Sequence, residues 1–167
     1  GCDIRSALPE MEAAARQGYS VIALGVDQQF CGFFVIADQL KSDTAQAIAQ
    51  LKDMGITPVM VTGDHPLSAH AIARQAGIDE VIAKVLPQEK GEVVKRFQNE
   101  HKVAMVGDGI NDAVALTQAD VGIAIGSGSD VAVESADIIL MKEGIADVAT
   151  AIRLSKAVIR NMHQNLF

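Results

Sequence analysis

Short apolar runs alternate with helical patterns along the chain from Val59 onward. The runs fit buried strands, and the segments between them show apolar residues at helical spacing. Strands that alternate with helices build parallel sheets. The pattern therefore predicts an α/β fold, a doubly wound parallel sheet with flanking helices, in which strands at 59–61, 81–83, 103–106, 121–125 and 138–141 are interleaved with helices that include 66–76 and 87–97.

The first part of the chain has a different pattern. Residues 8–18 are helix-like, and residues 20–26 and 30–37 read as two strands of a hairpin around an Asp27-Gln28-Gln29 turn. One helix and one hairpin are too little for a stable domain. We therefore interpret residues 1–36 as a small α+β remnant, the end of a second domain whose greater part lies outside this sequence.

Helix ends carry recognisable chemistry. Asp43 begins a helical segment that ends at Gly55. The helix expected at 66–76 ends at Gly77. From Ile145 the apolar residues keep helical spacing up to Phe167 without a breaker. The expected domains are thus the remnant at 1–36, a main domain at 37–150 and a helix at 151–167.

Composition narrows the class of protein. The 167 residues are 49% hydrophobic and 21% charged, enough apolar content for a buried core, and the net charge is −7. An acidic chain without basic runs gives no support for nucleic-acid or anionic-membrane binding. No apolar run approaches the ~18 residues of a membrane span, so a soluble fragment is expected. Cys2 and Cys31 lack metal-ligand spacing and fit reduced, cytosolic thiols.

The strongest chemical signal is the run MVGDGINDAVAL at 105–116. A strand ends there in a Gly-Asp-Gly turn, and Asn111 and Asp112 follow Asp108 within a few residues. Two carboxylates and an amide at the carboxyl edge of a sheet suit Mg²⁺ with a phosphate beside it. The plain alternative is that these residues only make a turn.

Two further motifs favour the chemical interpretation. The run VMVTGD at 59–64 ends a second strand with Thr62, Gly63 and Asp64, and Lys90 lies in the first turn of the next helix but one. A hydroxyl and a glycine amide can hold phosphate oxygens, and an ammonium can offset their charge. Together with the carboxylates, these groups are what phosphoryl transfer requires.

These motifs resemble a known family. The runs TGD, LPQEK, MVGDGINDAVAL and ADVGIAIGSGSDVAVESADIIL resemble the phosphorylation domain of P-type ATPases, a Rossmann-type branch of the haloacid dehalogenase-like superfamily, over residues 37–167. Residues 120–140 look most like the heavy-metal-transporting branch. The ending RNMHQNLF at 160–167 resembles the start of a membrane helix in copper(I) exporters, and the hairpin at 19–37 resembles the close of the nucleotide-binding domain.

The resemblance implies a role for each matching residue. Asp108 would bind Mg²⁺, with Asp112 as a supporting carboxylate. The transferred phosphoryl group would be held by Thr62, Gly63, Lys90 and Asn111. Asp38 and Asp64 would face the nucleotide. ATP would be the substrate and Mg²⁺ the cofactor, on the cytoplasmic side of a membrane pump whose other parts, the membrane helices and the nucleotide-binding and actuator domains, are the expected partners.

The sequence departs from the family in three places. The family usually has proline at the positions of Val114 and Gln39, neither of which would hold phosphate. More importantly, the string Asp-Lys-Thr-Gly-Thr, whose aspartate is the family's nucleophile, does not occur. Asp27 and Asp38 follow apolar strands but lack the downstream threonine, so neither is accepted as a substitute. The chain by itself is expected to bind without turning over.

Three functions stay open at this point. The first is the cytosolic part of a heavy-metal pump, with copper(I) as the ion. The second is a stand-alone Mg²⁺-dependent phosphatase of the same superfamily, and the third is a non-catalytic module that binds Mg²⁺ and phosphate. The sequence around this segment in its gene separates them. The histidines and cysteines show no ligand spacing, although His65 follows Asp64 closely enough to approach a phosphate.

Overall fold

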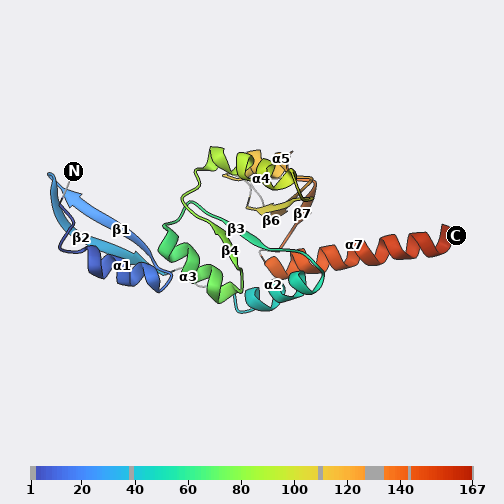
Figure 1. The fold of residues 1–167 in the computed structure, drawn as a ribbon, viewed down its shortest axis with the longest axis horizontal. Coiled ribbons are helices and arrows are strands. Elements are labelled where there is room, and N and C mark those ends of the chain that lie inside the picture. The colour runs from blue at the N-terminus through green and yellow to red at the C-terminus, as the bar shows by residue number, and fades with distance from the viewer. Residues whose placement is uncertain (1–2, 38–39, 109–110, 127–133, 143, 167) are drawn as a thin grey trace. The chain divides into compact units, whose positions relative to one another are not determined.

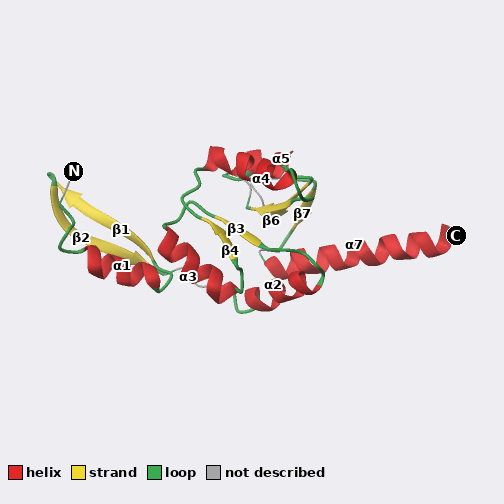
Figure 2. Ribbon diagram, viewed as in Figure 1, coloured by secondary structure: helices red, strands yellow, loops and turns green. Residues whose placement is uncertain are grey.

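A computed structural model of the chain describes residues 3–37, 40–108, 111–126, 134–142 and 144–166. It is a mixed α/β protein with parallel strand pairs and flanking helices, as predicted (Figures 1 and 2). The Cα positions divide into two compact units, Gly1–Ser42 with Pro58–Val85 and Asp43–Thr57 with Leu86–Phe167. Each unit is described below by itself.

The first unit contains the predicted hairpin. Strands β1 (Ser20–Val26) and β2 (Gln29–Ile36) pair antiparallel, with Val26 opposite Gln29. Asp27 and Gln28 form the two-residue turn with φ of 48° and 63°. Positive φ at both turn residues matches the right-handed twist of the strands, which explains why the chain reverses here. Helix α1 (Leu8–Arg16) contacts β1 and α3.

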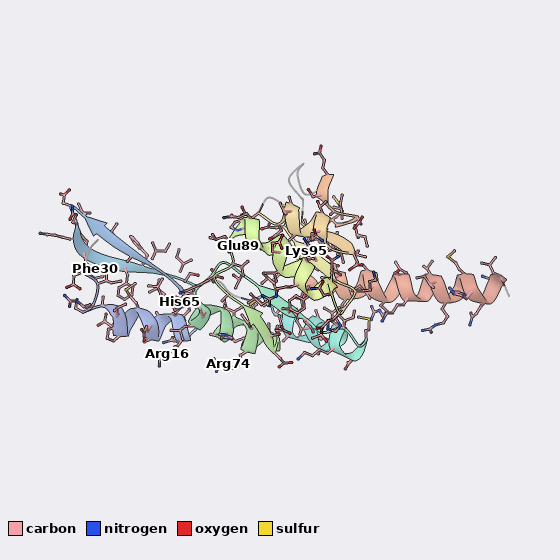
Figure 3. All side chains as sticks on the ribbon, turned by 45° about the horizontal axis from the view of Figure 1, so that its top comes forward. Arg16, Phe30, His65, Arg74, Glu89 and Lys95 are labelled. Carbon is pink, nitrogen blue, oxygen red and sulfur yellow. The ribbon has the colours of Figure 1, made fainter. Side chains whose placement is uncertain are left out.

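A strand-helix-strand element forms the rest of this unit. Strands β3 (Val59–Val61) and β4 (Glu80–Ile82) pair in parallel, and α3 (Pro66–Ala76) connects them. Helix α3 starts where His65 Nδ1 accepts a hydrogen bond from the Leu67 N–H at 3.3 Å, and it ends at Gly77, whose φ is 78° (Figure 3). Both ends follow common capping chemistry.

The second unit is built on an all-parallel sheet. Its strands are β5 (Ala104–Gly107), β6 (Val121–Ile125) and β7 (Ile138–Leu140), in that order. The short 3₁₀ helix η1 (Pro87–Glu89) leads into α4 (Lys90–Gln98), and α5 (Ala113–Gln118) connects β5 to β6. Ala115, Leu116, Ile123 and Ala124 are almost fully buried and form the centre of this core.

Helices α2 (Thr44–Asp53) and α7 (Ile145–Leu166) pack on each other in the same unit. Val148 and Ala149, in the first turns of α7, are buried, and the Lys156 ammonium donates to the Met54 carbonyl at 3.1 Å. Apolar side chains further along α7 are exposed. Among the described residues, no helix is both long and apolar enough to cross a bilayer.

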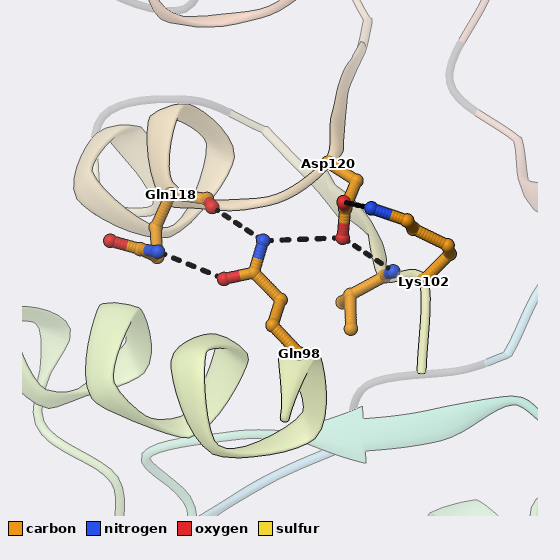
Figure 4. A network of polar contacts seen from close by, with 5 residues as sticks. Gln98, Lys102, Gln118 and Asp120 are labelled. Carbon is orange, nitrogen blue, oxygen red and sulfur yellow. Dashed lines mark hydrogen bonds and ion pairs between the residues drawn. The ribbon is translucent and has the colours of Figure 1, made fainter. Parts of the chain in front are cut away.

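A polar network closes the end of this sheet at which β5 and β6 begin (Figure 4). The Asp120 carboxylate accepts from the Lys102 ammonium at 2.7 Å, the Val103 N–H at 3.0 Å and the Gln98 amide at 3.2 Å. Gln98 also donates to the Gln118 carbonyl at 3.0 Å. The network ties the ends of α4 and α5 to the sheet, and the hydrogen bonds from Lys102 first, then from Val103 and Gln98, lower the pKa of Asp120 to about 2.

The predicted elements are confirmed to within a residue or two, with one refinement in how the strands pair. The hydrogen bonds of β3 and β4 form one ladder in the first unit, and those of β5, β6 and β7 form another in the second. The helix expected at 87–97 starts as one 3₁₀ turn before it becomes α-helical.

Candidate functional site

The Thr62-Gly63-Asp64 loop follows β3 in the first unit. The Thr62 hydroxyl donates to the Asp64 carboxylate at 2.9 Å, and the Asp64 N–H donates to the Thr62 hydroxyl oxygen at 3.1 Å. Gly63 and Asp64 are exposed. The hydroxyl and the carboxylate thus form a tight polar turn beside an exposed glycine.

The segment after β4 holds this loop from the side. The Lys84 N–H donates to the Asp64 carbonyl at 3.1 Å, and the Val85 N–H donates to the Thr62 carbonyl at 3.0 Å. Lys84 makes this possible with φ of 57°, a left-handed conformation that is uncommon outside glycine, asparagine and aspartate. A Cβ added to Gly63 would lie 3.4 Å from the Val85 carbonyl oxygen, so the loop and the segment are closely packed.

Lys90 and Asp112 form an ion pair in the second unit. Lys90 is the first residue of α4, and its Nζ lies 2.5 Å from Oδ1 of Asp112, the residue before α5. The side chains are only 15% and 11% exposed. Removal from water strengthens the attraction between the two charges, and the same removal makes loss of either partner costly.

Asp112 sits directly over the end of β5. A Cβ added to Gly107 would lie 2.5 Å from Oδ2 of Asp112, far inside contact distance, so only glycine leaves room for the carboxylate. Asp108 follows Gly107, and Asp108 and Asn111 are both exposed. The carboxyl end of β5 therefore carries one buried, paired carboxylate and, beside it in sequence, an exposed carboxylate and an exposed amide.

The predicted site residues divide between the units. The structure brings together Lys90 and Asp112, with Asp108 and Asn111 on the same β5–α5 connection. Thr62, Gly63 and Asp64 belong to the first unit, so their convergence with Lys90 on one phosphate stays a prediction. Asp38 lies outside the described residues.

The donor set at the end of β5 fits Mg²⁺. This ion usually takes one or two carboxylates and completes its octahedron with water and substrate phosphate. Asp108 offers an exposed carboxylate, whereas Asp112 has one oxygen engaged by Lys90. Among the described residues, no three histidine, cysteine or acidic side chains gather as an all-protein cage would require. An ion bound at this end of β5 would therefore take only some of its ligands from the described residues.

Sequence reasoning did not identify every residue that shapes the site. It assigned Lys90 to phosphate without its partner Asp112, because 22 residues separate them. It also missed the left-handed backbone of Lys84, because lysine, unlike glycine or asparagine, gives no indication of that conformation in a sequence. The Gly-Asp-Gly motif could have indicated the close approach at Gly107. His65, considered for phosphate, caps α3 with Nδ1 instead.

Comparisons with known proteins agree with this architecture. The profile of the haloacid dehalogenase-like hydrolases matches residues 5–120. The chain belongs to this family.

Within it, the similar proteins are P-type ATPases. The chain is 49% identical over its full length to Copper-transporting ATPase 1 of Rhizobium meliloti (strain 1021), and 48% identical over its full length to a copper-exporting P-type ATPase of Vibrio cholerae serotype O1. It covers 20% and 18% of these relatives. A crystal structure of a zinc-transporting PIB-type ATPase in the E2.Pi state matches 98% of this chain with a TM-score of 0.79 and 35% identity, over 27% of its own length.

The chain thus spans about a fifth of the curated relatives that it matches. The sequence resemblance to P-type ATPases and the haloacid dehalogenase-like fold are confirmed.

Proposed function

We propose that the chain is the cytoplasmic phosphorylation segment of an ATP-driven heavy-metal pump that exports copper(I). In this proposal it supplies the residues that bind Mg²⁺ and phosphate, while the nucleophilic aspartate lies elsewhere in the whole protein. The names of the curated relatives support copper as the ion. Zinc is the second candidate, because a structural neighbour of similar fold is described as zinc-transporting.

One observation carries the proposal: the partly buried Lys90–Asp112 pair at the end of β5, next in sequence to the exposed Asp108. The pair fixes an ammonium beside the connection that carries Asp108 and Asn111. An ammonium, an amide and a carboxylate presented together are suited to a phosphoryl group, whose oxygens become more negative during transfer.

Each residue then has a chemical task. Asp108 would hold Mg²⁺, which when bound offsets negative charge on the phosphoryl oxygens. Lys90 and Asn111 would donate hydrogen bonds to those oxygens, and Asp112 would keep Lys90 oriented. Thr62 and Gly63 would hold the phosphoryl group from the other loop, and Asp38 and Asp64 would face ATP.

The proposal includes a division of labour along the chain. Residues 1–36 would close the nucleotide-binding domain, residues 37–150 would form the phosphorylation domain, and residues 151–167 would lead toward a membrane helix. The partners would be the rest of the same pump, its membrane helices and its nucleotide-binding and actuator domains. Phosphorylation would bias domain movements that switch access to the ion.

A test needs the full-length protein in vesicles. We expect uptake of Cu⁺ that depends on ATP and exceeds uptake of Zn²⁺ and Cd²⁺. Asp108→Asn should lower both phosphorylation and Cu⁺ uptake by about 100-fold or more, as loss of a charge-stabilising group in a transition state does. Asp53→Asn, which changes an exposed carboxylate at the end of α2, is the matched control and should leave both unchanged.

Two results would contradict the proposal. Full phosphorylation in the Asp108→Asn protein would remove Asp108 from the chemistry. A whole gene without Asp-Lys-Thr-Gly-Thr and without apolar spans would favour a binding module, and one with another nucleophile strand but no spans would favour a stand-alone phosphatase.

A further inference from the structure

The geometry of the Lys90–Asp112 pair depends on how closely α4 approaches α5. Lys90 starts α4, and Asp112 immediately precedes α5. The two helices are in contact. With Nζ and Oδ1 only 2.5 Å apart, a small separation of the helices would break the contact.

Gly91 lies where the two helices meet. It is buried in α4, next to Lys90. A Cβ added to it would lie 2.9 Å from Cγ1 of Val114 and 3.7 Å from the Val114 carbonyl oxygen. The first distance is shorter than real Cβ contacts, whereas the second is an ordinary van der Waals contact. Only the Val114 side chain therefore opposes a larger residue at position 91.

Val114 is 62% exposed, so the movement of its side chain is limited by its own rotamer preference and not by neighbouring side chains. It lies in the first turn of α5, two residues after Asp112, and a β-branched side chain in a helix is largely confined to one χ1 rotamer. Asp112 cannot move inward, because its Oδ2 and Cβ already lie over Gly107. A methyl group at Gly91 would therefore push α4 away from α5 and carry the start of α4, with Lys90, away from Asp112.

We propose that Gly91 and Val114 are a matched pair of positioning residues that sets the Lys90–Asp112 contact. The missing side chain on α4 accommodates the branched side chain on α5, and the two helices come close enough for the ammonium to reach the carboxylate. The catalytic importance of this contact rests on the function proposed above, but the pairing itself is a property of the chain and is measurable without ATP.

The test uses the reactivity of individual lysines in the whole 167-residue chain. Acetic anhydride modifies exposed, unpaired amines, and mass spectrometry gives the rate at each lysine. In the unchanged protein Lys90, which is 15% exposed, should react slowly, and Lys102, which is 91% exposed, provides the internal reference. The variants are Gly91→Ala, Val114→Ala and the double variant.

Gly91→Ala should raise the modification rate of Lys90 relative to Lys102 by about fivefold to tenfold, which lies within the range of coupling energies between residues in contact. Val114→Ala alone should change this ratio by less than about twofold, and in the double variant the ratio should return to within about twofold of the original, because removal of the Val114 methyl groups clears the space. Rescue by the second substitution is a result that general destabilisation would not give.

The proposal is overturned if Gly91→Ala leaves the Lys90 ratio unchanged, or if the double variant leaves Lys90 as reactive as the single variant. If Gly91→Ala does not fold, the double variant decides alone: it must fold and protect Lys90, and an unfolded or reactive double variant overturns the pairing. If Lys90 is protected in the chain but the full-length protein never forms a phosphoenzyme, the proposed function is refuted and the pairing stays intact.

Discussion

At the scale of single residues, two features dominate the site: a partly buried charge pair and a strained lysine. Lys90 and Asp112 both lose hydration when they pair, and this cost offsets most of the attraction between their charges, so the pair adds little net stability. Removal of either residue would leave the other charge mostly buried without a partner. Lys84 adopts a left-handed backbone that a side chain disfavours, and it does so where its N–H holds the Thr62-Gly63-Asp64 loop. Both features, the desolvated charge pair and the strained backbone, are locally unfavourable in free energy and lie beside residues proposed to bind phosphate.

Replacement of Lys90 by methionine should destabilise the fold. The change leaves the Asp112 carboxylate mostly buried without its partner, which costs about 3 kcal/mol in comparable sites. Urea unfolding followed by circular dichroism measures the loss. Lys102→Met is the control, since that ammonium is 91% exposed and should matter much less. Equal losses in the two variants would show that the Lys90 pair is not special.

Replacement of Lys84 by glycine should stabilise the fold by about 1 kcal/mol, because glycine adopts the left-handed conformation without steric cost. Lys84→Val should destabilise it, since a β-branched residue disfavours positive φ most. Thermal unfolding of the two variants and of Lys84→Ala measures these effects, and alanine controls for loss of the side chain. A valine variant as stable as the glycine variant would contradict the assignment of strain.

At the scale of elements, the two ends of the β5–β6 ladder have different roles. The carboxyl end carries Asp108 and Asp112, whereas the amino end carries the Asp120 network that joins α4 and α5 to the sheet. The network is structural and lies at the end of the strands opposite the proposed chemistry. It therefore offers a measure of stability that is independent of phosphate binding.

Asp120 predicts a defined pH dependence. Its pKa is about 2 in the folded chain, first because of the hydrogen bond from Lys102, against about 3.9 in an unfolded chain. Between these values the unfolded chain binds more protons, so the contribution of Asp120 is complete above about pH 5 and is lost as the pH falls from about 4 to 2. The difference in urea midpoint between the original chain and Asp120→Asn should shrink over that range.

The partner residue supplies the control. Lys102→Met removes the first cause of the low pKa, so in that background the shrinkage should be smaller and should end at a higher pH, while its onset, set by the pKa of the unfolded chain, stays the same. A difference between the original chain and Asp120→Asn that stays constant from pH 6 to 2 would contradict the role of the carboxylate.

The sequence predicted these elements well because their signals are local. Hydrophobic periodicity and the Pro66 and Gly77 boundaries place α3, and the hairpin follows from alternation around a polar turn. The Lys90–Asp112 contact and the Gly91–Val114 fit could not be predicted, since each depends on how two helices pack after folding. The same applies to the division of the strands into two hydrogen-bonded ladders.

At the scale of the whole molecule, the proposed site would need a nucleophile from outside this sequence. The chain carries the residues proposed to bind Mg²⁺ and phosphate, but no Asp-Lys-Thr-Gly-Thr string to supply a nucleophile. We expect the isolated chain to release phosphate from ATP no faster than buffer does, because covalent transfer needs an acceptor. A malachite-green assay measures this rate. Steady hydrolysis that Asp108→Asn abolishes, with no other chain present, would show that the interpretation is wrong.

The division into units has a practical consequence for dissecting the protein. The backbone passes from one unit to the other after Ser42, Thr57 and Val85, so neither unit is a continuous stretch of sequence. A truncation that begins at Leu86 would lose α2, the helix that packs on α7. A fragment that retains the second core must join 43–57 to 86–167 through a linker or a circular permutation, and a single proteolytic cut at any of these passages should not release either half in a native state.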